Sequence, residues 1–341
     1  MSVIRYGIVG ASGIAQRRVL PAFPHSQHST ATAICSRSLD KARALAAEFE
    51  IENACDSLDE LLKHVDAVYV ATPVHCHLDE ARQVISAGKH LLIEKPLGRT
   101  AQEGRDILAL AESSSVYAME AYMMKFHPAH AAIHDAVLSG KIGRIVYARA
   151  RLGCWYPDLA GSWRQDRQLS GGGALMDLGS HLIDLLTWIL GPIDSLQAHC
   201  NTQLFNYEVE DSATAILHFA NGAHGIIESY FSVPDQAGSG VLELIGTEGR
   251  IVAEGTVGQS GAGTVTWNIF PTQATYDALQ EKTPTAEHES VVYPPFDLYA
   301  AQLDYFSNCI LQKTPPALNR LDEGVAVLEW IEKAYGAPVS L

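Results

Sequence analysis

The first 120 residues alternate between short apolar runs and amphipathic helical patterns, and this alternation limits the fold more than any other feature. Apolar runs of strand length predict strands, and the segments between them, which begin with polar or capping residues, predict helices. The predicted strands are Val3–Val9, Ser29–Cys35, Ala67–Ala71, His90–Glu94 and Val116–Met119, and the predicted helices are Ser38–Phe49, Leu58–Lys63, Leu78–Gly88 and Thr100–Ser113. Strands that alternate with helices imply right-handed βαβ crossovers and a parallel sheet.

The pattern changes after Met123, where strands begin to follow one another without intervening helices. A helix is predicted over Pro128–Ser139, a strand over Ile145–Arg151, and a helix over residues 174–190 after a glycine-rich loop. The later strands are predicted at Ala213–Phe219, Ala223–Phe231, Gly240–Ile245, Arg250–Ala253 and Val265–Phe270, and the closing helices at Leu298–Gln312 and Asp322–Tyr335. We therefore predict an α/β chain with a parallel-sheet domain over residues 1–123. An α+β domain with a large, mostly antiparallel open sheet is predicted over residues 124–341.

Composition excludes several classes of protein. The net charge of −15, from 24 Lys and Arg against 39 Asp and Glu, disfavours nonspecific binding to nucleic acid or anionic lipid. The six cysteines are scattered without a C-x-x-C pair, which argues against a disulfide scaffold or a cysteine-based zinc site. A strand beginning at Val3 leaves no room for a signal peptide, and no apolar run approaches the ~18–20 residues of a membrane span. We expect a soluble, cytoplasmic protein.

The segment Gly10-Ala11-Ser12-Gly13-Ile14-Ala15 follows the first predicted strand and opens a helical stretch. The dinucleotide fingerprint has glycines for a tight turn and for close approach to a pyrophosphate, and a final glycine or alanine for helix–strand packing. Gly10 and Ala15 fit its ends, and Ser12 stands in place of the second glycine with Gly13 beside it. Together with Ile14, these residues predict a dinucleotide site in a Rossmann domain, with phosphates at the helix N-terminus. The alternative is an ordinary glycine turn.

The end of the second predicted strand indicates which dinucleotide is bound. It reads Cys35-Ser36-Arg37-Ser38, followed by Lys41, and it has no acid before Asp40. An acid near this place would bind the ribose of NAD, whereas a hydroxyl and a guanidinium suit a 2′-phosphate. We therefore favour NADP bound by Ser36, Arg37 and Lys41. NAD remains the alternative, with Arg37 then a solvated side chain.

Two more strand ends lie at the same predicted sheet edge. The third strand ends in Ala71-Thr72-Pro73, and the fourth ends in Glu94-Lys95-Pro96. An apolar strand that ends in Lys-Pro holds an ammonium where α/β proteins bind ligands, and proline fixes the backbone there, in a trans or a cis peptide. The alternative is a strand that ends in a surface lysine. His75-Cys76-His77 lacks metal partners elsewhere in the sequence, so we predict no metal site.

These motifs together resemble the glucose–fructose oxidoreductase/inositol dehydrogenase (Gfo/Idh/MocA) family over nearly the whole chain. The matching pieces are 10–15, 71–73 with His77, 87–90, 94–96, 120–128, 140–143, 171–181 and 244–249. The resemblance implies an NAD(P)-dependent oxidoreductase that forms a homodimer or homotetramer through its C-terminal sheet. It also places Ala71, Thr72, Pro73, His77, Glu94, Lys95 and Pro96 at the cofactor. The chain departs from the family pattern at Ser12, at Val74, where asparagine is frequent, and at Lys125, where arginine is usual.

Asp177 and His181 are four residues apart on one predicted helix, so they project from the same face. Histidine titrates near neutrality and can exchange a proton with a substrate hydroxyl or carbonyl. The family places this aspartate and histidine, with the lysine of Glu-Lys-Pro, around the carbon that exchanges hydride, which carries over to Asp177, His181 and Lys95. The alternatives are a hydrogen-bonded pair on the helix surface and a zinc pair without a third ligand.

The predicted function is hydride transfer between a nicotinamide and a hydroxyl or carbonyl group of a sugar, cyclitol or related polyol. We assign Tyr122, Lys125, Trp163 and Arg164 to the substrate pocket, together with Asp177 and His181. One alternative is a dihydrodiol-dehydrogenase-like enzyme on less polar diols, suggested by residues 120–128. Another is a sugar- or cofactor-sensing regulator without turnover, which the joint presence of Lys95, Asp177 and His181 disfavours.

Overall fold

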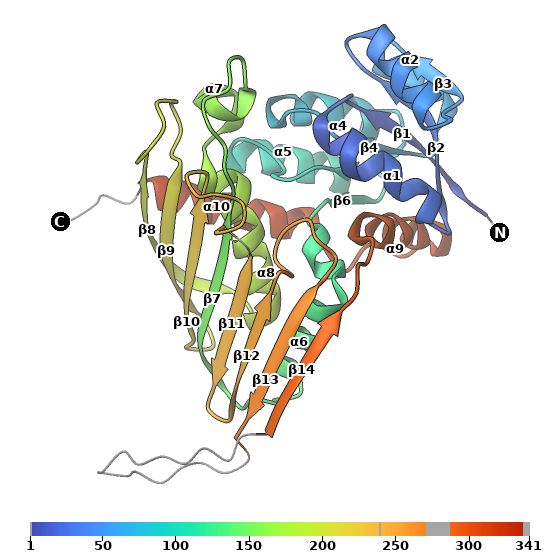
Figure 1. The fold of residues 1–341 in the computed structure, drawn as a ribbon. Helices are drawn as coiled ribbons and strands as arrows, with labels where there is room; N and C mark the ends of the chain where they lie inside the picture. Colours follow the sequence, from blue (N-terminus) through green and yellow to red (C-terminus); the bar gives the residue numbers. More distant parts are fainter. Residues whose placement is uncertain (1, 239, 271–286, 337–341) are drawn as a thin grey trace, which may run out of the picture. The chain divides into compact units, whose positions relative to one another are not determined.

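A computed structural model describes residues 2–238, 240–270 and 287–336 of the chain (Figure 1). These residues form two compact units. The described parts of Met1–Met123, Gly161–Gly172 and Asp297–Glu332 form the first unit, and those of Met124–Ala160, Gly173–Phe296 and Lys333–Leu341 form the second. The predicted domain boundary after residue 123 stays a prediction.

The first unit contains a parallel sheet whose six described strands lie in the order β3-β2-β1-β4-β5-β6. Its strands are β1 (Ile4–Val9), β2 (Ser29–Cys35), β3 (Asn53–Cys55), β4 (Ala67–Val70), β5 (His90–Ile93) and β6 (Ala118–Glu120). All four residues of β4 are buried, as expected for a parallel strand that is covered on both faces. This sheet confirms the predicted Rossmann-like fold of the N-terminal half.

Short and long helices connect these strands. After β1 come η1 (Ala15–Val19), α1 (Leu20–Ala22) and η2 (Phe23–His25), and later α2 (Leu39–Glu48), α3 (Leu58–Leu61), η3 (Leu62–His64), η4 (Val74–Cys76), α4 (His77–Ser86) and α5 (Ala101–Glu112). Later segments add η6 (Trp163–Gln165), α7 (Arg167–Ser170), α9 (Leu298–Gln312) and α10 (Leu321–Gly336). Because the Ser307 hydroxyl in α9 lies 3.0 Å from Tyr6 Oη and 2.8 Å from Ser29 Oγ, α9 is fixed against β1 and β2.

The second unit contains a larger sheet of eight described strands in the order β14-β13-β12-β11-β7-β10-β9-β8 (Figure 1). Its strands are β7 (Ile145–Gly153), β8 (Ile193–Asn201), β9 (Ser212–Phe219), β10 (His224–Tyr230), β11 (Val241–Gly246), β12 (Gly249–Glu254), β13 (Gly263–Ile269) and β14 (Glu287–Tyr293). Only the described pair β7–β10 is parallel, and the other pairings are antiparallel. The predicted large, mostly antiparallel sheet is confirmed.

The same half contains the short helix η5 (Met123–Phe126) and the π-helical turn η7 (Leu175–Gly179), which continues directly into α8 (Ser180–Leu190). The helix α6 (Pro128–Leu138) packs beside α8. The helix α8 is buried almost throughout and packs on β7. One stretch, Arg167–Leu190, is long and apolar enough to cross a membrane by length and composition alone. Within it, 78% of the most apolar window is buried in the structure, as in a core helix.

Candidate active site

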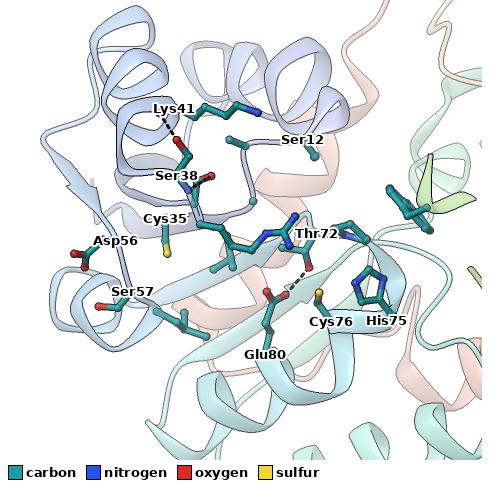
Figure 2. Close-up of a pocket in the computed structure, with 18 of the residues that line it drawn as sticks. Ser12, Cys35, Ser38, Lys41, Asp56, Ser57, Thr72, His75, Cys76 and Glu80 are labelled. Atoms are coloured by element: carbon teal, nitrogen blue, oxygen red, sulfur yellow. Dashed lines mark hydrogen bonds between the residues drawn. The ribbon is translucent and has the colours of Figure 1, made fainter. Parts of the chain in front are cut away.

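A cavity of about 780 Å³ lies at the carboxyl ends of β1, β2 and β4 in the first unit (Figure 2). Open α/β sheets bind ligands at this edge, where strand order reverses around the first strand. The glycine turn after β1, the segments after β2, β3 and β4, helix α4, and η6 all contribute to its wall. Its lining residues are Val9, Gly10, Ala11, Ser12, Gly13, Cys35, Ser36, Arg37, Ser38, Lys41, Asp56, Ser57, Leu58, Thr72, Pro73, His75, Cys76, Glu80, Gln83, Trp163 and Arg164.

The glycine turn has the conformation that the fingerprint requires. Gly10 has a φ of +104°, and a Cβ there would lie 2.9 Å from both the carbonyl oxygen of Ala71 and Cγ2 of Thr72. Any side chain at this position would therefore be strained and would collide with the turn after β4. Ser12 Oγ accepts a hydrogen bond from the Ala15 N–H at 3.3 Å, so the serine that replaces a glycine satisfies a backbone donor at the start of η1.

Basic side chains line the cavity beside the end of β2. Arg37 is exposed, and Lys41 lies at the start of α2, whose N-cap Ser38 accepts the Lys41 N–H (Figure 2). Arg164 adds a third cationic group, which stacks on the Trp163 ring at 4.3 Å. A glycine turn at a helix start, together with these cations and hydroxyls, fits a dinucleotide that carries an additional phosphate.

Thr72, which the sequence assigned to the cofactor, donates a hydrogen bond of 2.5 Å to the carboxyl group of Glu80. Burial raises the pKa of Glu80 to about 7, although Thr72 and the nearby Arg37 lower it. Glu80 was not predicted from the sequence, because a buried acid inside an amphipathic helical pattern is indistinguishable from a solvated one.

The Glu94 carboxyl holds the segment Glu94-Lys95-Pro96 in place through two hydrogen bonds. Glu94 is buried, and its carboxyl accepts hydrogen bonds from the Tyr69 hydroxyl at 2.8 Å and from the Lys95 N–H at 3.3 Å. Burial raises the pKa of Glu94, and Lys95 and Tyr69 lower it. The Lys95–Pro96 peptide is cis, one of the two forms expected there. These contacts fix the backbone from which Lys95 projects.

His77 joins two segments that the sequence assigned to the cofactor. Its ring nitrogens lie 3.1 Å from the carbonyl oxygen of Pro96 and 3.2 Å from that of Thr72. Its side chain is buried, and this burial lowers the pKa of His77 to about 4, so the ring is neutral at pH 7. His77 is not among the residues that line the cavity, and its contacts support the turns around it.

Asp177 and His181 lie on the continuous helical segment formed by η7 and α8 in the second unit. The Ser180 N–H donates to the Leu175 carbonyl, five residues earlier, so the helix is wider at Asp177 than the regular helix that the sequence predicted. Such π-helical turns occur frequently at functional sites. His181 is 6% exposed, and Asp177 is partly exposed.

A buried carboxylate fixes the start of this helical segment. Glu210 accepts hydrogen bonds from the N–H groups of Gly173 at 3.0 Å and Leu175 at 2.9 Å, and from the Tyr335 hydroxyl at 2.8 Å. A Cβ at Gly173 would lie 1.9 Å from the Glu210 carbonyl oxygen, so only glycine fits there. Glu210 was missed, because 35 residues separate it from Leu175 and no local pattern marks it.

The remaining predicted substrate residues lie in different surroundings. Lys125 forms a buried ion pair with Asp184 of α8, with 2.8 Å between Nζ and Oδ1. Tyr122 is 2% exposed, and its carbonyl oxygen accepts a hydrogen bond from Asn319. Trp163 and Arg164 line the cavity with the predicted cofactor residues.

The structure thus brings together Gly10, Ser12, Gly13, Ser36, Arg37, Lys41, Thr72 and Pro73 around one cavity. Lys95 belongs to the first unit, whereas Asp177 and His181 belong to the second, so their joint action stays a prediction. Within residues 2–238, 240–270 and 287–336, no three His, Cys, Asp or Glu side chains are grouped to hold a metal ion.

Comparison with known proteins identifies both halves of the chain. Residues 4–122 match the oxidoreductase family with an NAD-binding Rossmann fold, and residues 130–252 match the GFO/IDH/MocA C-terminal domain. A Haloferax volcanii protein, D-xylose 1-dehydrogenase (NADP(+)) 2, is 30% identical over 345 residues, covering 98% of this chain and 99% of its own length.

Other relatives act on different compounds. Trans-1,2-dihydrobenzene-1,2-diol dehydrogenase of Mus musculus is 34% identical over 226 residues, covering 65% of this chain and 67% of its own. The crystal structure of aldose-aldose oxidoreductase from Caulobacter crescentus, complexed with glycerol, matches with a TM-score of 0.85 and 25% identity, covering 98% of this chain and 97% of that one. The chain therefore belongs to the GFO/IDH/MocA family of oxidoreductases, whose N-terminal domain is an NAD-binding Rossmann fold.

Proposed function

We propose that this NAD(P)-dependent oxidoreductase prefers NADP and transfers hydride to or from a hydroxyl or carbonyl group of a sugar, cyclitol or related polyol. The observation that carries the proposal is the lining of the cavity at the sheet edge. Arg37 and Lys41 line it near the place where NAD-binding domains have an acid that binds the ribose. The family match and the full-length similarity to a D-xylose dehydrogenase that uses NADP support it.

The residues that would hold NADP follow from the lining of the cavity. The backbone around Gly10, Ser12 and Gly13 would receive the pyrophosphate, and Ser36, Arg37 and Lys41 would bind the 2′-phosphate. Ile14, Ala15, Ala71, Pro73 and Pro96 would provide packing around these contacts. When bound, the nicotinamide supplies the hydride chemistry, and the protein supplies position and electrostatics.

In this proposal Lys95 polarises the substrate oxygen. Its backbone is fixed by the Glu94 carboxyl, which Tyr69 holds in turn, so the ammonium starts from a rigid strand end. A positive charge beside an oxygen that becomes an alkoxide stabilises the transition state, and it does so in either direction of the reaction.

His181 is proposed to donate a proton to the substrate oxygen during reduction and to accept it during oxidation. Asp177, four residues earlier, would orient the imidazole or the substrate. The support for these roles is the rigid frame around both residues, because Glu210 fixes the start of the segment and the Lys125–Asp184 ion pair holds α8. Tyr122, Lys125, Trp163 and Arg164 complete the proposed set of substrate residues, with Lys125 acting through its partner Asp184.

A second candidate function is the oxidation of less polar diols. The specific observation in its favour is the 34% identity to the dihydrobenzenediol dehydrogenase of Mus musculus. Both functions use the same cofactor site and the same proposed proton transfer, so they differ only in the substrate.

We further propose that the protein self-associates through the open face of the large sheet and functions in the cytoplasm. On this face Ile216 of β9, an apolar side chain, is 49% exposed. Sedimentation at micromolar concentration should give a dimer or a dimer of dimers, and a strict monomer would contradict this proposal.

The experiment that tests the function is a substrate screen with both cofactors. Aldoses, ketoses, inositols and dihydrodiols would each be mixed with the protein and NADP or NAD, and absorbance of the reduced nicotinamide would be followed. The proposal expects turnover with a sugar or cyclitol and a higher kcat/KM for NADP. Turnover of dihydrodiols alone would favour the second candidate, and a preference for NAD would contradict the cofactor assignment.

A further inference from the structure

An acidic side chain, Glu80, faces the cavity from α4. Figure 2 shows Glu80, Thr72 and Cys76 gathered on one side of the cavity, with the Glu80 carboxyl directed at the Thr72 hydroxyl. The carboxyl is partly buried, and the 2.5 Å hydrogen bond from Thr72 fixes its position in the wall. An ionised carboxylate in the wall of a cavity that is proposed to bind phosphates would repel them.

Charged and titratable groups reach Glu80 from each element around it. Arg37, after β2, attracts the carboxylate, whereas Asp79, beside it on α4, repels it. Cys35 at the end of β2 and Cys76 in η4 also face it, and burial raises the pKa of both thiols, so they are neutral at pH 7. Burial dominates this balance and raises the pKa of Glu80 to about 7, so both protonation states are populated near neutral pH.

A bound 2′-phosphate would bring between one and two additional negative charges into this cavity. Arg37 would attract the phosphate, but an ionised Glu80 would repel it and would compete with it for Arg37. A protonated Glu80 removes the repulsion and still bonds to Thr72, because a carboxylic acid retains an acceptor oxygen.

We propose that Glu80 determines how cofactor selectivity depends on pH, because it must be protonated for tight binding of NADP but not of NAD. The inference rests on the proposed function, since it places the 2′-phosphate beside Arg37. Near neutral pH the protein takes up a proton from solvent onto Glu80 as NADP binds. The preference for NADP over NAD therefore weakens as the pH rises through neutrality.

The sign of this dependence separates Glu80 from the phosphate itself. The 2′-phosphate of NADP titrates near pH 6, and its dianion binds cations more strongly, so the ligand alone would give an affinity that rises with pH. An affinity for NADP that falls with pH above neutrality therefore requires a protein group that loses a proton, as Glu80 does.

The first test is calorimetry on the wild-type protein in two buffers with different ionisation enthalpies at about pH 7.5. The proposal expects proton uptake on binding of NADP and almost none on binding of NAD. Absence of proton uptake with NADP would overturn the inference. Weaker binding of NADP than of NAD at every pH would overturn the proposed function as well, so the two failures are distinguishable.

The second test is the substitution Glu80→Gln, which keeps an acceptor for Thr72 and removes the charge. At about pH 8.5 we expect this variant to bind NADP about tenfold more tightly than the wild type, without proton uptake, because one titrating proton is removed. Binding of NAD should be unchanged. The matched control is Asp79→Asn, since Asp79 is exposed, pairs with Arg82 and does not line the cavity. An equal pH dependence in Glu80→Gln and wild type would overturn the inference.

Discussion

The buried ion pair between Lys125 and Asp184 gives the sharpest prediction about the second unit. Lys125 Nζ lies 2.8 Å from Asp184 Oδ1, and the two side chains are only 2% and 3% exposed. Removing one partner of such a pair leaves a charge in a place that water does not reach, which typically costs about 3–5 kcal/mol. Replacing both partners with apolar side chains of similar volume removes the charge together with its counter-charge, and is often nearly neutral.

We therefore expect Lys125→Met to destabilise the protein by about 3–5 kcal/mol, and Lys125→Met/Asp184→Leu to recover most of that loss. For domains of about 150–250 residues, 1 kcal/mol corresponds to roughly 2–4 °C, so the single variant should unfold about 6–20 °C lower. Differential scanning calorimetry on the two variants and the wild type measures this directly.

The control is Lys141→Met, because Lys141 is exposed and stacks on Trp267 at 4.4 Å, a contact worth only about 0.5–1 kcal/mol. The reasoning would be refuted if Lys125→Met were as mild as this control. It would equally be refuted if the double variant were less stable than the single one.

Three further predictions concern the cofactor cavity. Arg37→Ala should weaken NADP binding by about 1.5–3 kcal/mol, the cost of a lost charged hydrogen bond, and leave NAD binding nearly unchanged; equal losses in titrations with both cofactors would reject the assignment. Gly10→Ala should weaken the binding of both cofactors alike and lower the unfolding temperature, because its Cβ would meet the backbone of Ala71 at 2.9 Å. If the variant bound both cofactors as tightly as the wild type, the tight turn would be excluded. Burial raises the pKa of Glu80 from 4.5 to about 7. The contribution of protonated Glu80 to the free energy of unfolding is therefore complete below pH 4.5 and is lost as the pH rises through 7. Glu80→Gln should then be more stable than wild type by about 1–2 kcal/mol at high pH, with solvent reducing the full effect, and equally stable at low pH; denaturant titrations at the two pH values decide this.

Much of the fold follows from local pattern. The run Ser29–Cys35 forms β2 with the predicted bounds, and α9 also begins and ends as predicted, because apolar periodicity and the capping Asp297 are both local signals. The strand β3 covers only Asn53–Cys55 and has no apolar run, and β14 lies at a sheet edge with the polar sequence Glu287–Tyr293, so neither shows the pattern of a buried strand.

The site was predictable where it depends on backbone geometry and not where it depends on distant contacts. Gly10 was found because a tight turn requires glycine, and Arg37 because it follows a strand end. Glu80 and Glu210 act through partners that the chain brings near only in three dimensions. His77 was assigned to the cofactor on resemblance alone, and its contacts with two backbone carbonyl groups could not be derived from sequence.

The most direct test of the proposed mechanism is the single-turnover rate of hydride transfer in His181→Ala, measured by stopped-flow absorbance with saturating NADP and the substrate found in the screen. We expect the rate to fall by about two to four orders of magnitude, as for loss of a general acid or base, while the dissociation constant of NADP stays nearly unchanged. Lys95→Ala should also be slow, with some loss of cofactor affinity. A His181→Ala rate close to that of the wild type would contradict the account, because the proton would then come from another group.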